Sequence, residues 1–213
     1  MDSFSIFSTF FGAIWYFFPI LVIILIIKTP WFKGLFGEFI VYFSAWLSLD
    51  KKKYHIIRNV TLPAYDETTQ IDLIIISIYG VFVIEVKNMK GWIFGSQNQK
   101  TWTQKIFKHT NKFQNPLRQN YKHVKTLESL LGLKENQIHS VVVFIGDSTF
   151  KTSMPENVTY GWGYIRHIKS KKQKVLSEPD VAEMINKIEN KRLVRSFKTN
   201  KEHIKNVRTI KKG

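Results

Sequence analysis

The chain has 213 residues, which leaves room for one soluble domain of ordinary size and a membrane segment. It contains no cysteine, so disulfides, thiolate zinc sites and cysteine nucleophiles are excluded. The formal net charge is +16, and residues 28–213 carry all 32 basic side chains against 15 acidic ones. This excess favours a polyanionic partner, either nucleic acid or an anionic lipid surface, although a purely solubilising role also accounts for it.

The N-terminal residues predict a membrane anchor. No side chain in residues 3–27 is charged, and residues 10–27 are almost wholly apolar. A helix of about 20 apolar residues spans the hydrocarbon core of a bilayer, and a proline such as Pro19 is tolerated there. A cleaved signal peptide instead requires a basic start, a shorter apolar run and a small-residue cleavage site. We therefore predict one transmembrane helix within residues 1–30.

Basic residues predict the orientation of this anchor. Lys28 and Lys33 follow the apolar run, and no basic side chain precedes it. By the positive-inside rule, the N-terminus lies outside the cell and the C-terminal domain lies in the cytoplasm. The apolar side chains just beyond the run are then expected at the level of the lipid headgroups, namely Trp31, Phe32, Leu35 and Phe36.

The next residues predict a helix followed by three strands. Residues 37–49 have a broad apolar side typical of a helix, and residues 54–62 are consistent with a strand. Residues 70–78 and 81–87 are rich in β-branched side chains, which favours two further strands. A two-residue loop at Tyr79-Gly80 joins these two strands into a hairpin.

The remaining elements complete an α/β pattern. A hairpin-like piece is expected within residues 91–102, and a helix over residues 117–131 after Asn115-Pro116. The continuous apolar run at residues 138–145 predicts a buried strand, and residues 177–193 predict a last helix. This order predicts an α/β fold in which helices flank one mixed sheet.

Three polar residues stand out in the central hairpin. Asp72 interrupts the apolar strand 70–78, and Glu85 and Lys87 lie near the end of the next strand. Alternation along the strands predicts that all three side chains emerge on one face. The two-residue loop would place Asp72 opposite Lys87, with Glu85 one diagonal step from Asp72, roughly 7–8 Å away at the backbone.

This grouping has two interpretations. Two carboxylates supply hard oxygen ligands, which suit Mg²⁺ or Mn²⁺, and a bound ion could activate water and neutralise a phosphodiester. Lys87 could then orient or deprotonate the water, or stabilise the developing charge. The alternative is an ordinary cross-strand ion pair between Asp72 and Lys87, with Glu85 solvated, and the residues alone do not decide between the two.

Several separated blocks together resemble one known family, the nuclease-related domain (NERD) family. They are Gly37-Glu38, Gln70-Ile71-Asp72, Gly80 to Asn88, Gly91, Trp102 and Asn115 to Gln119. That family is similar to the PD-(D/E)xK restriction-endonuclease-like fold, although Ile71 stands where the name of that motif has proline. The resemblance implies metal and catalytic roles for Asp72, Glu85 and Lys87. It also implies that Glu38 is an additional acidic group that holds the metal together with Asp72 and Glu85, and that Gln119 acts in catalysis through a contact with substrate or a catalytic water.

The chain thus divides into four parts. The apolar run predicts an anchor at residues 1–30, and the resemblance implies a NERD domain at 37–150. The remaining pattern predicts an extension at 151–194 that ends in a helix, and a basic tail at 195–213. The predicted function is a membrane-anchored nuclease that uses Mg²⁺ or Mn²⁺ on DNA or RNA. The alternative is a non-catalytic module that holds nucleic acid or a protein at the membrane.

Overall fold

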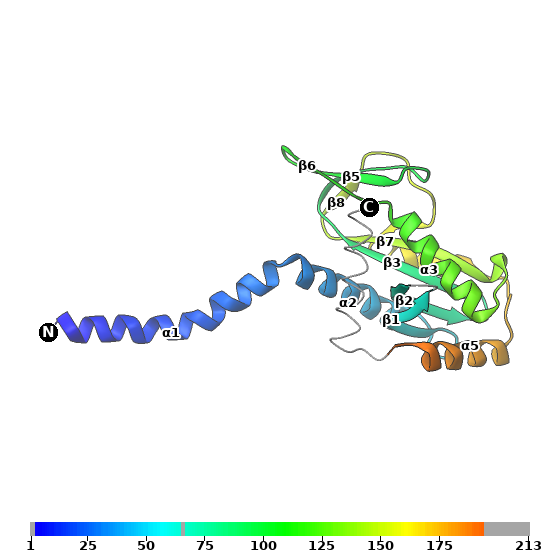
Figure 1. Cartoon of the computed structure of the whole chain (residues 1–213), viewed down its shortest axis with the longest axis horizontal. Coiled ribbons are helices and arrows are strands. Elements are labelled where there is room, and N and C mark those ends of the chain that lie inside the picture. The colour runs from blue at the N-terminus through cyan, green and yellow to red at the C-terminus, as the bar shows by residue number, and fades with distance from the viewer. Residues whose placement is uncertain (1–2, 65–66, 194–213) are drawn as a thin grey trace.

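The computed structural model describes residues 3–64 and 67–193. The basic tail predicted at residues 195–213 lies outside this described part of the chain. The described residues form a mixed α/β fold with two sheets, and a long N-terminal helix extends away from them (Figure 1).

Two helices begin the chain, α1 (Ser3–Lys28) and α2 (Pro30–Ser48). Thr29 separates them, because its hydroxyl accepts the Phe32 N–H at 3.2 Å and so caps the first turn of α2. Pro30 follows at the first helical position, where a missing N–H costs nothing. These two residues explain why α2 begins before the helix predicted at residues 37–49.

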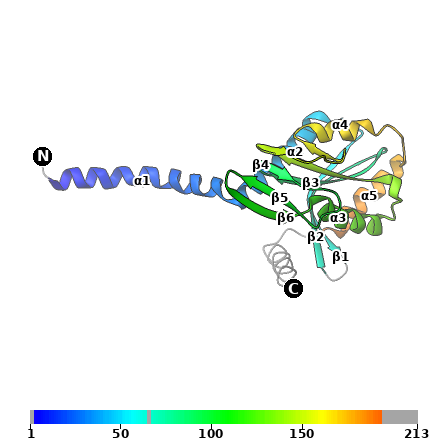
Figure 2. The ribbon, with the colours of Figure 1, turned by 90° about the horizontal axis from the view of Figure 1, so that it is seen from above.

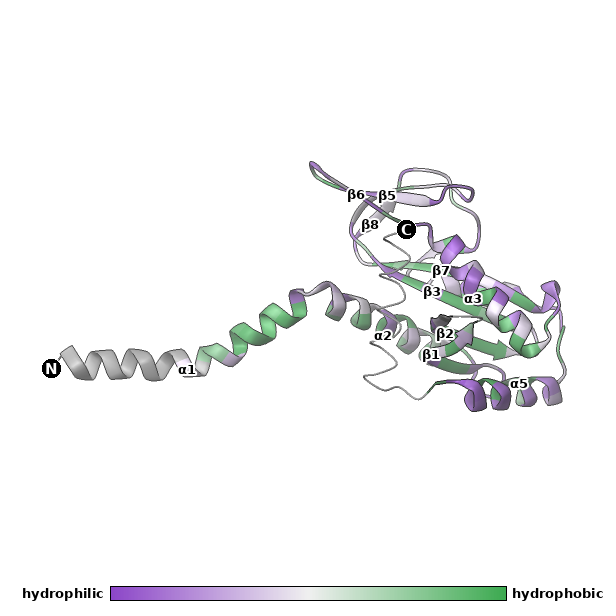
Figure 3. Ribbon diagram, viewed as in Figure 1, coloured by the Kyte–Doolittle hydropathy of each residue, from purple (hydrophilic) through white to green (hydrophobic). Residues whose placement is uncertain are grey.

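The membrane anchor remains a prediction. Among the residues whose side chains the structure describes, no single helix is both long and apolar enough to cross a bilayer. The segments Phe17–Lys28 and Pro30–Ser48 meet the requirement only as a pair, and their axes are bent by 72° at the break between them. The first of these segments is coloured as strongly hydrophobic in Figure 3.

The larger sheet has five strands in the order β1-β2-β3-β7-β9. The first three form an antiparallel meander, and β3, β7 and β9 run parallel to one another. Their bounds are β1 (His55–Ala64), β2 (Glu67–Ser77), β3 (Gly80–Asn88), β7 (Ile138–Ile145) and β9 (Val158–Tyr160). The strands predicted near residues 54–62, 70–78, 81–87 and 138–145 are therefore present.

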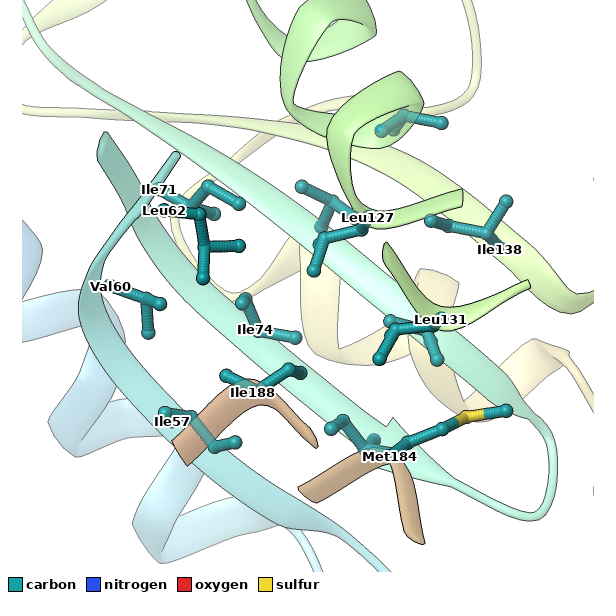
Figure 4. Packing of buried hydrophobic residues seen from close by; sticks show 14 of the residues in the cluster. Ile57, Val60, Leu62, Ile71, Ile74, Leu127, Leu131, Ile138, Met184 and Ile188 are labelled. Atoms are coloured by element: carbon teal, nitrogen blue, oxygen red, sulfur yellow. The ribbon is translucent and has the colours of Figure 1, made fainter. Parts of the chain in front are cut away.

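Helices cover both faces of this sheet. On one face, α3 (Pro116–Leu131) and α5 (Glu178–Lys191) bury a cluster of aliphatic side chains, seen closely in Figure 4. On the other face, α2 and α4 (Gly163–Ser170) bury a second cluster. Figure 2 shows these two pairs of helices on opposite sides of β3. Strands covered on both faces read as continuous apolar runs, which is what β3 and β7 show.

A second, smaller sheet accompanies the predicted mixed sheet. It has four strands in the order β6-β5-β4-β8. Only the antiparallel pairing of β4 with β5 was expected, as the hairpin in residues 91–102. The other two strands escaped prediction because one is polar and the other is very short. The bounds are β4 (Gly91–Phe94), β5 (Thr101–Ile106), β6 (His109–Gln114) and β8 (Ser148–Phe150).

The central hairpin has a different register from the predicted one. Ser77 pairs with Gly80, so the loop consists of Ile78 and Tyr79. The Ser77 hydroxyl accepts the Tyr79 N–H at 3.2 Å and stabilises this tight turn. Relative to the predicted register, the two strands are shifted by two residues. The position opposite Asp72 is therefore that of Glu85 and not that of Lys87. Because the shift is an even number, each side chain of β3 stays on its predicted face.

Candidate functional site

The candidate site lies where β2 and β3 separate. Paired residues of the two strands end at Leu73 and Ile84. Beyond this pair, the Val86 N–H donates to Asp72 Oδ2 at 2.8 Å, so a side-chain carboxylate replaces a backbone carbonyl as the acceptor. The strand ends are therefore open enough for side chains to converge, and Asp72 is held there by a charge-assisted hydrogen bond.

Asp72 does not share the face predicted for it. In the β1–β2 ladder, Arg58 pairs with Leu73 and Val60 pairs with Ile71, but the ladder is interrupted between these pairs, where Asn59 faces Asp72. Asn59 has φ of 52°, a left-handed conformation that is uncommon for residues other than glycine. The alternation of β2 breaks at the same place, so Ile71 joins the aliphatic cluster under α3 and α5 together with Ile74, whereas Asp72 lines a cavity on the side of α2.

Glu85, Lys87 and Gln119 form a hydrogen-bonded cluster. Lys87 Nζ donates to Glu85 Oε1 at 2.6 Å and to Gln119 Oε1 at 2.9 Å. Glu85 is only 2% exposed, and the Lys87 side chain is 20% exposed, so the pair is poorly screened by water. The structure therefore brings together three of the four residues predicted to act in catalysis, two from β3 and one from the first turns of α3.

His123 extends this cluster on the buried side. His123 Nε2 lies 3.2 Å from Glu85 Oε2, and Nδ1 lies 2.7 Å from the Thr69 hydroxyl. This separation is within ion-pair distance, and the hydrogen bond and charge of His123 help to lower the pKa of Glu85. Glu85 therefore lies between Lys87 on one side and His123 on the other, and the imidazole limits where its carboxylate can turn.

Asn120 fixes the helix that carries these side chains. Its side-chain amide donates to Val83 O at 2.8 Å and to Val141 O at 3.2 Å, so it reaches the backbones of both β3 and β7. It also donates to the Ser140 hydroxyl at 2.9 Å. Asn115 caps the start of the same helix by accepting the Leu117 N–H at 2.9 Å. With both contacts in place, Gln119 and His123 project from a fixed helix.

The pKa values of the two buried carboxylates, Asp72 and Glu85, are shifted in opposite directions. Burial raises the pKa of Asp72 well above its usual value, and the neighbouring carboxylates of Glu85 and Glu38 raise it further. The hydrogen bond from Val86 and the charge of Lys87 only partly offset these effects. For Glu85, burial also raises the pKa, but Lys87 and His123 together outweigh burial and hold the pKa below its usual value. Glu85 therefore ionises readily, whereas a second negative charge on Asp72 is disfavoured unless a further cation is present.

A cavity opens beside Asp72. It has a volume of about 360 Å³, and α2 forms one wall with Phe32, Leu35, Phe36 and Phe39. The polar part of its lining comes from Glu38, Arg58, Asn59 and Asp72. Glu38 therefore lies on the same cavity as Asp72, as the resemblance implied for an additional acidic group.

The donor set suits a small divalent cation only if the ion keeps some of its own water. Among residues 3–64 and 67–193, no three His, Asp or Glu side chains converge closely enough to hold a metal ion alone. Mg²⁺ in proteins is usually bound by one or two carboxylates, and waters and substrate phosphates complete its coordination. Asp72 and Glu85 match this smaller set in the number and type of ligands, and burial together with the Glu85 carboxylate raises the pKa of Asp72, so a second negative charge there is disfavoured unless a cation is near.

Prediction from the sequence missed His123, Thr69, Asn120 and Asn59. His123 follows Gln119 by four residues on one face of a helix, which was the available signal. His123 was not predicted as a site residue because the histidines of the sequence show no spacing typical of a metal site. Asn59 and Thr69 become recognisable only once the strands are paired, since neither belongs to a motif.

Comparison with known proteins identifies a family for this chain. A model of the nuclease-related domain (NERD) family matches residues 33–145, which include every residue of the site. An uncharacterized protein of Bacillus anthracis is 50% identical over 104 residues, 48% of this chain and 48% of its own length. This chain thus spans about half the length of that curated relative, and no solved structure matches. The family match covers just over half of the 213 residues, and the chain belongs to the nuclease-related domain family.

Proposed function

We propose that this chain is a membrane-anchored nuclease that hydrolyses phosphodiester bonds with the help of Mg²⁺ or Mn²⁺. The observation that carries the proposal is the cluster of Glu85, Lys87 and Gln119 beside Asp72, at the open end of a rigid sheet. Buried charges are costly unless they are paired or bind an ion. An arrangement that keeps two carboxylates and a lysine together is therefore better explained by chemistry than by stability.

Among the roles considered for Lys87, the geometry favours stabilisation of developing charge over deprotonation of water. Its ammonium group donates to Glu85 and to Gln119, so it acts as a hydrogen-bond donor and a positive charge rather than as a base. A fixed positive charge in a poorly solvated site stabilises the negative charge that develops on a phosphodiester during attack by water. Gln119 holds Lys87 in position, and His123 limits the rotation of the Glu85 carboxylate.

Asp72 and Glu85 are the groups that would hold the cation. A cation bound there supplies charge neutralisation at the phosphate and lowers the pKa of a bound water. Lys87 restrains the Glu85 carboxylate through Oε1, and the Val86 N–H restrains Asp72 through Oδ2. Preorganised ligands of this kind reduce the cost of ordering the site when substrate arrives.

The charge distribution around the site supports nucleic acid as the substrate. From residue 86 to residue 127 the sequence has nine lysines and arginines and no aspartate or glutamate. This segment includes β4, β5, β6 and most of α3, so it adjoins the cluster through Gln119. Phosphate backbones bind such basic surfaces with a strong dependence on salt concentration.

The anchor and its orientation belong to the same proposal. The apolar segment Phe17–Lys28 ends in a lysine, and Lys33 follows it. These basic residues support an N-terminus outside the cell and a domain in the cytoplasm. A protease added to intact cells should leave the domain uncut, and cleavage of the domain would overturn this orientation. Cells made permeable provide the control, because the protease should then reach the domain.

A cleavage assay tests the catalytic part of the proposal. The full chain in detergent is incubated with DNA and RNA, with Mn²⁺ or Mg²⁺, beside the variants Lys87→Ala and Lys187→Ala. Lys187 is a matched control because it is a solvent-accessible lysine on α5 whose ion pair is with Glu183, outside the basic segment 86–127. We expect cleavage by the parent and by Lys187→Ala, and a loss of at least about 100-fold in Lys87→Ala.

The other outcomes are equally informative. Equal cleavage by all three proteins would mean that the activity is a contaminant or lies elsewhere. No cleavage by the parent, with binding of Mn²⁺ and nucleic acid retained, would favour a non-catalytic module that holds nucleic acid at the membrane.

A further inference from the structure

The helix α2 exposes a continuous apolar stripe to solvent. Its members recur at the spacing of one helical face, and each exposes between 40% and 56% of its surface. They are Phe36, Phe39, Ile40, Phe43, Trp46 and Leu47. Single exposed apolar residues are common, but a row of six large ones along one helix marks a surface that contacts another apolar phase.

Packing of the opposite face fixes the direction of this stripe. Gly37, Val41, Ser44 and Ala45 are the buried residues of α2, and they face the five-stranded sheet. A side chain in place of Gly37 would approach Asn88 and Ile145 to 2.9 Å, so the helix lies too close to the sheet to rotate. The core thus requires the larger apolar side chains of α2 to face outward.

Aromatic rings and lysines give the stripe the composition of a membrane interface. Phe43 stacks with Phe39 at a centroid distance of 6.0 Å and with Trp46 at 5.9 Å. Lys51 Nζ lies 3.5 Å from the centroid of the Trp46 ring. Lys33 precedes the stripe, and the lysines at 51–53 follow it. Helices that lie along a bilayer surface combine an apolar face rich in aromatic residues with basic side chains that bind anionic headgroups.

We propose that the outer face of α2 lies flat on the cytoplasmic surface of the membrane and buries its stripe among the lipid headgroups. The proposal rests on anchoring by α1, because the two helices meet at a bend of 72°. If the segment Phe17–Lys28 stands upright in the bilayer, a helix that leaves it at this angle runs nearly parallel to the surface. No linker separates the two helices beyond Thr29, so α2 cannot move far from the lipid.

Lipid fits this surface better than a second copy of the chain. In a symmetric antiparallel pair of α2 helices, Lys33 of each chain would approach the basic residues 51–53 of the other, and like charges repel. An anionic surface instead attracts both ends of the helix. Docking on lipid would also bring the cavity beside Asp72 close to the membrane, since Phe36 and Phe39 belong both to the stripe and to the wall of that cavity.

Depth measurements on labelled chains test this proposal. The sequence has no cysteine, so one introduced cysteine provides a single attachment site for a nitroxide. The sites are Phe43→Cys in the stripe, Ile24→Cys in α1 and Ser129→Cys, which is exposed on α3 across the sheet from α2. Phe39→Cys repeats the stripe measurement one turn earlier. The full chain is placed in vesicles of phosphatidylcholine and phosphatidylglycerol, and collisions with oxygen and with a water-soluble nickel complex are compared.

We expect the ratio of oxygen to nickel collisions to be highest at position 24, intermediate at 43 and 39, and lowest at 129. A label at 43 that is as accessible to nickel as the label at 129, with 24 still deep in lipid, would overturn the docking of α2 but leave the anchor. Shielding at 43 with dipolar broadening between labels would instead identify a second copy of the chain. Accessibility of position 24 to nickel would contradict the anchor, and position 43 would still report independently on α2.

Discussion

The two sheets of this protein are stabilised in different ways. The five-stranded sheet is apolar and covered on both faces, so its central strands are almost completely buried. The four-stranded sheet is largely polar, and it depends on a small cluster around Trp102 and on the hydrogen bonds of Asn115. Both sheets contribute to the site. Glu85 and Lys87 belong to the first, whereas the second holds the start of the helix that carries Gln119.

The two sheets support different residues of the site. Asp72 and Glu85 depend on the larger sheet, whereas Gln119, which positions Lys87, depends on the smaller one. Asp72 and Glu85 are fixed by the main core, and small changes at the periphery should not move them. Gln119 lies one turn after Asn115, whose amide donates to the backbone oxygens of Ser96, Gln97 and Gln99 in the loop between β4 and β5. The four-stranded sheet therefore acts as a support for α3, and it can be perturbed without unfolding the larger sheet.

The largest expected effect follows from removing Trp102. This side chain is fully buried, stacks on Phe144 at a centroid distance of 6.1 Å and meets Phe113 edge to face at 6.3 Å. We expect Trp102→Ala to lower the free energy of unfolding by about 4 kcal/mol. Hydrogen exchange should accelerate in β4, β5 and β6 and remain slow in β2 and β3. Trp92→Ala is the matched control, because Trp92 lies in the same sheet but is 48% exposed.

Uniform acceleration of exchange through both sheets in Trp102→Ala would contradict this account, since it would mean that the two sheets unfold as one unit. A change in the free energy of unfolding as large for Trp92→Ala as for Trp102→Ala would also contradict it.

A smaller loss is expected from Asn115→Ala. The variant removes the cap of α3 and leaves three backbone oxygens of the β4–β5 loop without their side-chain donor. We expect a loss of about 2–3 kcal/mol in the free energy of unfolding, measured by urea denaturation. Asn111→Ala, at an exposed position of β6, should change it by less than about 0.5 kcal/mol. Equal stability of Asn115→Ala and the parent would show that the support is not needed.

The smallest expected effect is a gain in stability instead of a loss. The folded state raises the pKa of Asp72, so this group favours folding at low pH, and the benefit is lost as the pH rises through the raised pKa. Asp72→Asn removes the negative charge but can still accept the Val86 N–H. We therefore expect the variant to melt at a higher temperature than the parent at about pH 8, with the difference shrinking toward about pH 5. A variant that melts at a lower temperature at the higher pH would contradict the described repulsion among carboxylates.

Much of the larger sheet could be predicted from the sequence, because burial on both faces leaves a clear apolar pattern. The helix over residues 117–131 and the strand over 138–145 were predicted almost to their ends for the same reason. Strand alternation grouped Asp72, Glu85 and Lys87, whereas Gln119 and the expectation of catalysis came from the family resemblance. Their assignment to catalysis and to metal binding remains a prediction.

The rest depended on tertiary structure. The loop of the central hairpin was misplaced by one residue because Gly80, with φ of 124°, begins β3 instead of lying in the loop, and Ser77 accepts the Tyr79 N–H across the turn. The direction of Asp72 was misjudged because the alternation of β2 breaks between Ile71 and Ile74, which lie in the same cluster, and the sequence pattern does not reveal this break. Short elements such as β8, β9 and α4 carry too little local pattern to be predicted, since they form only against strands distant in sequence.

Binding of Mn²⁺ tests the central claim, that Asp72 and Glu85 at the open end of the five-stranded sheet form a cation site. Thermal unfolding of the full chain is followed while Mn²⁺ is added to the parent, to Glu85→Gln and to Glu128→Gln, a glutamate paired with Lys125 on α3. A ligand that binds only the folded state raises the melting temperature by mass action. We predict such a rise for the parent and for Glu128→Gln, and none for Glu85→Gln. An equal rise in all three proteins would place the cation elsewhere and contradict the claim.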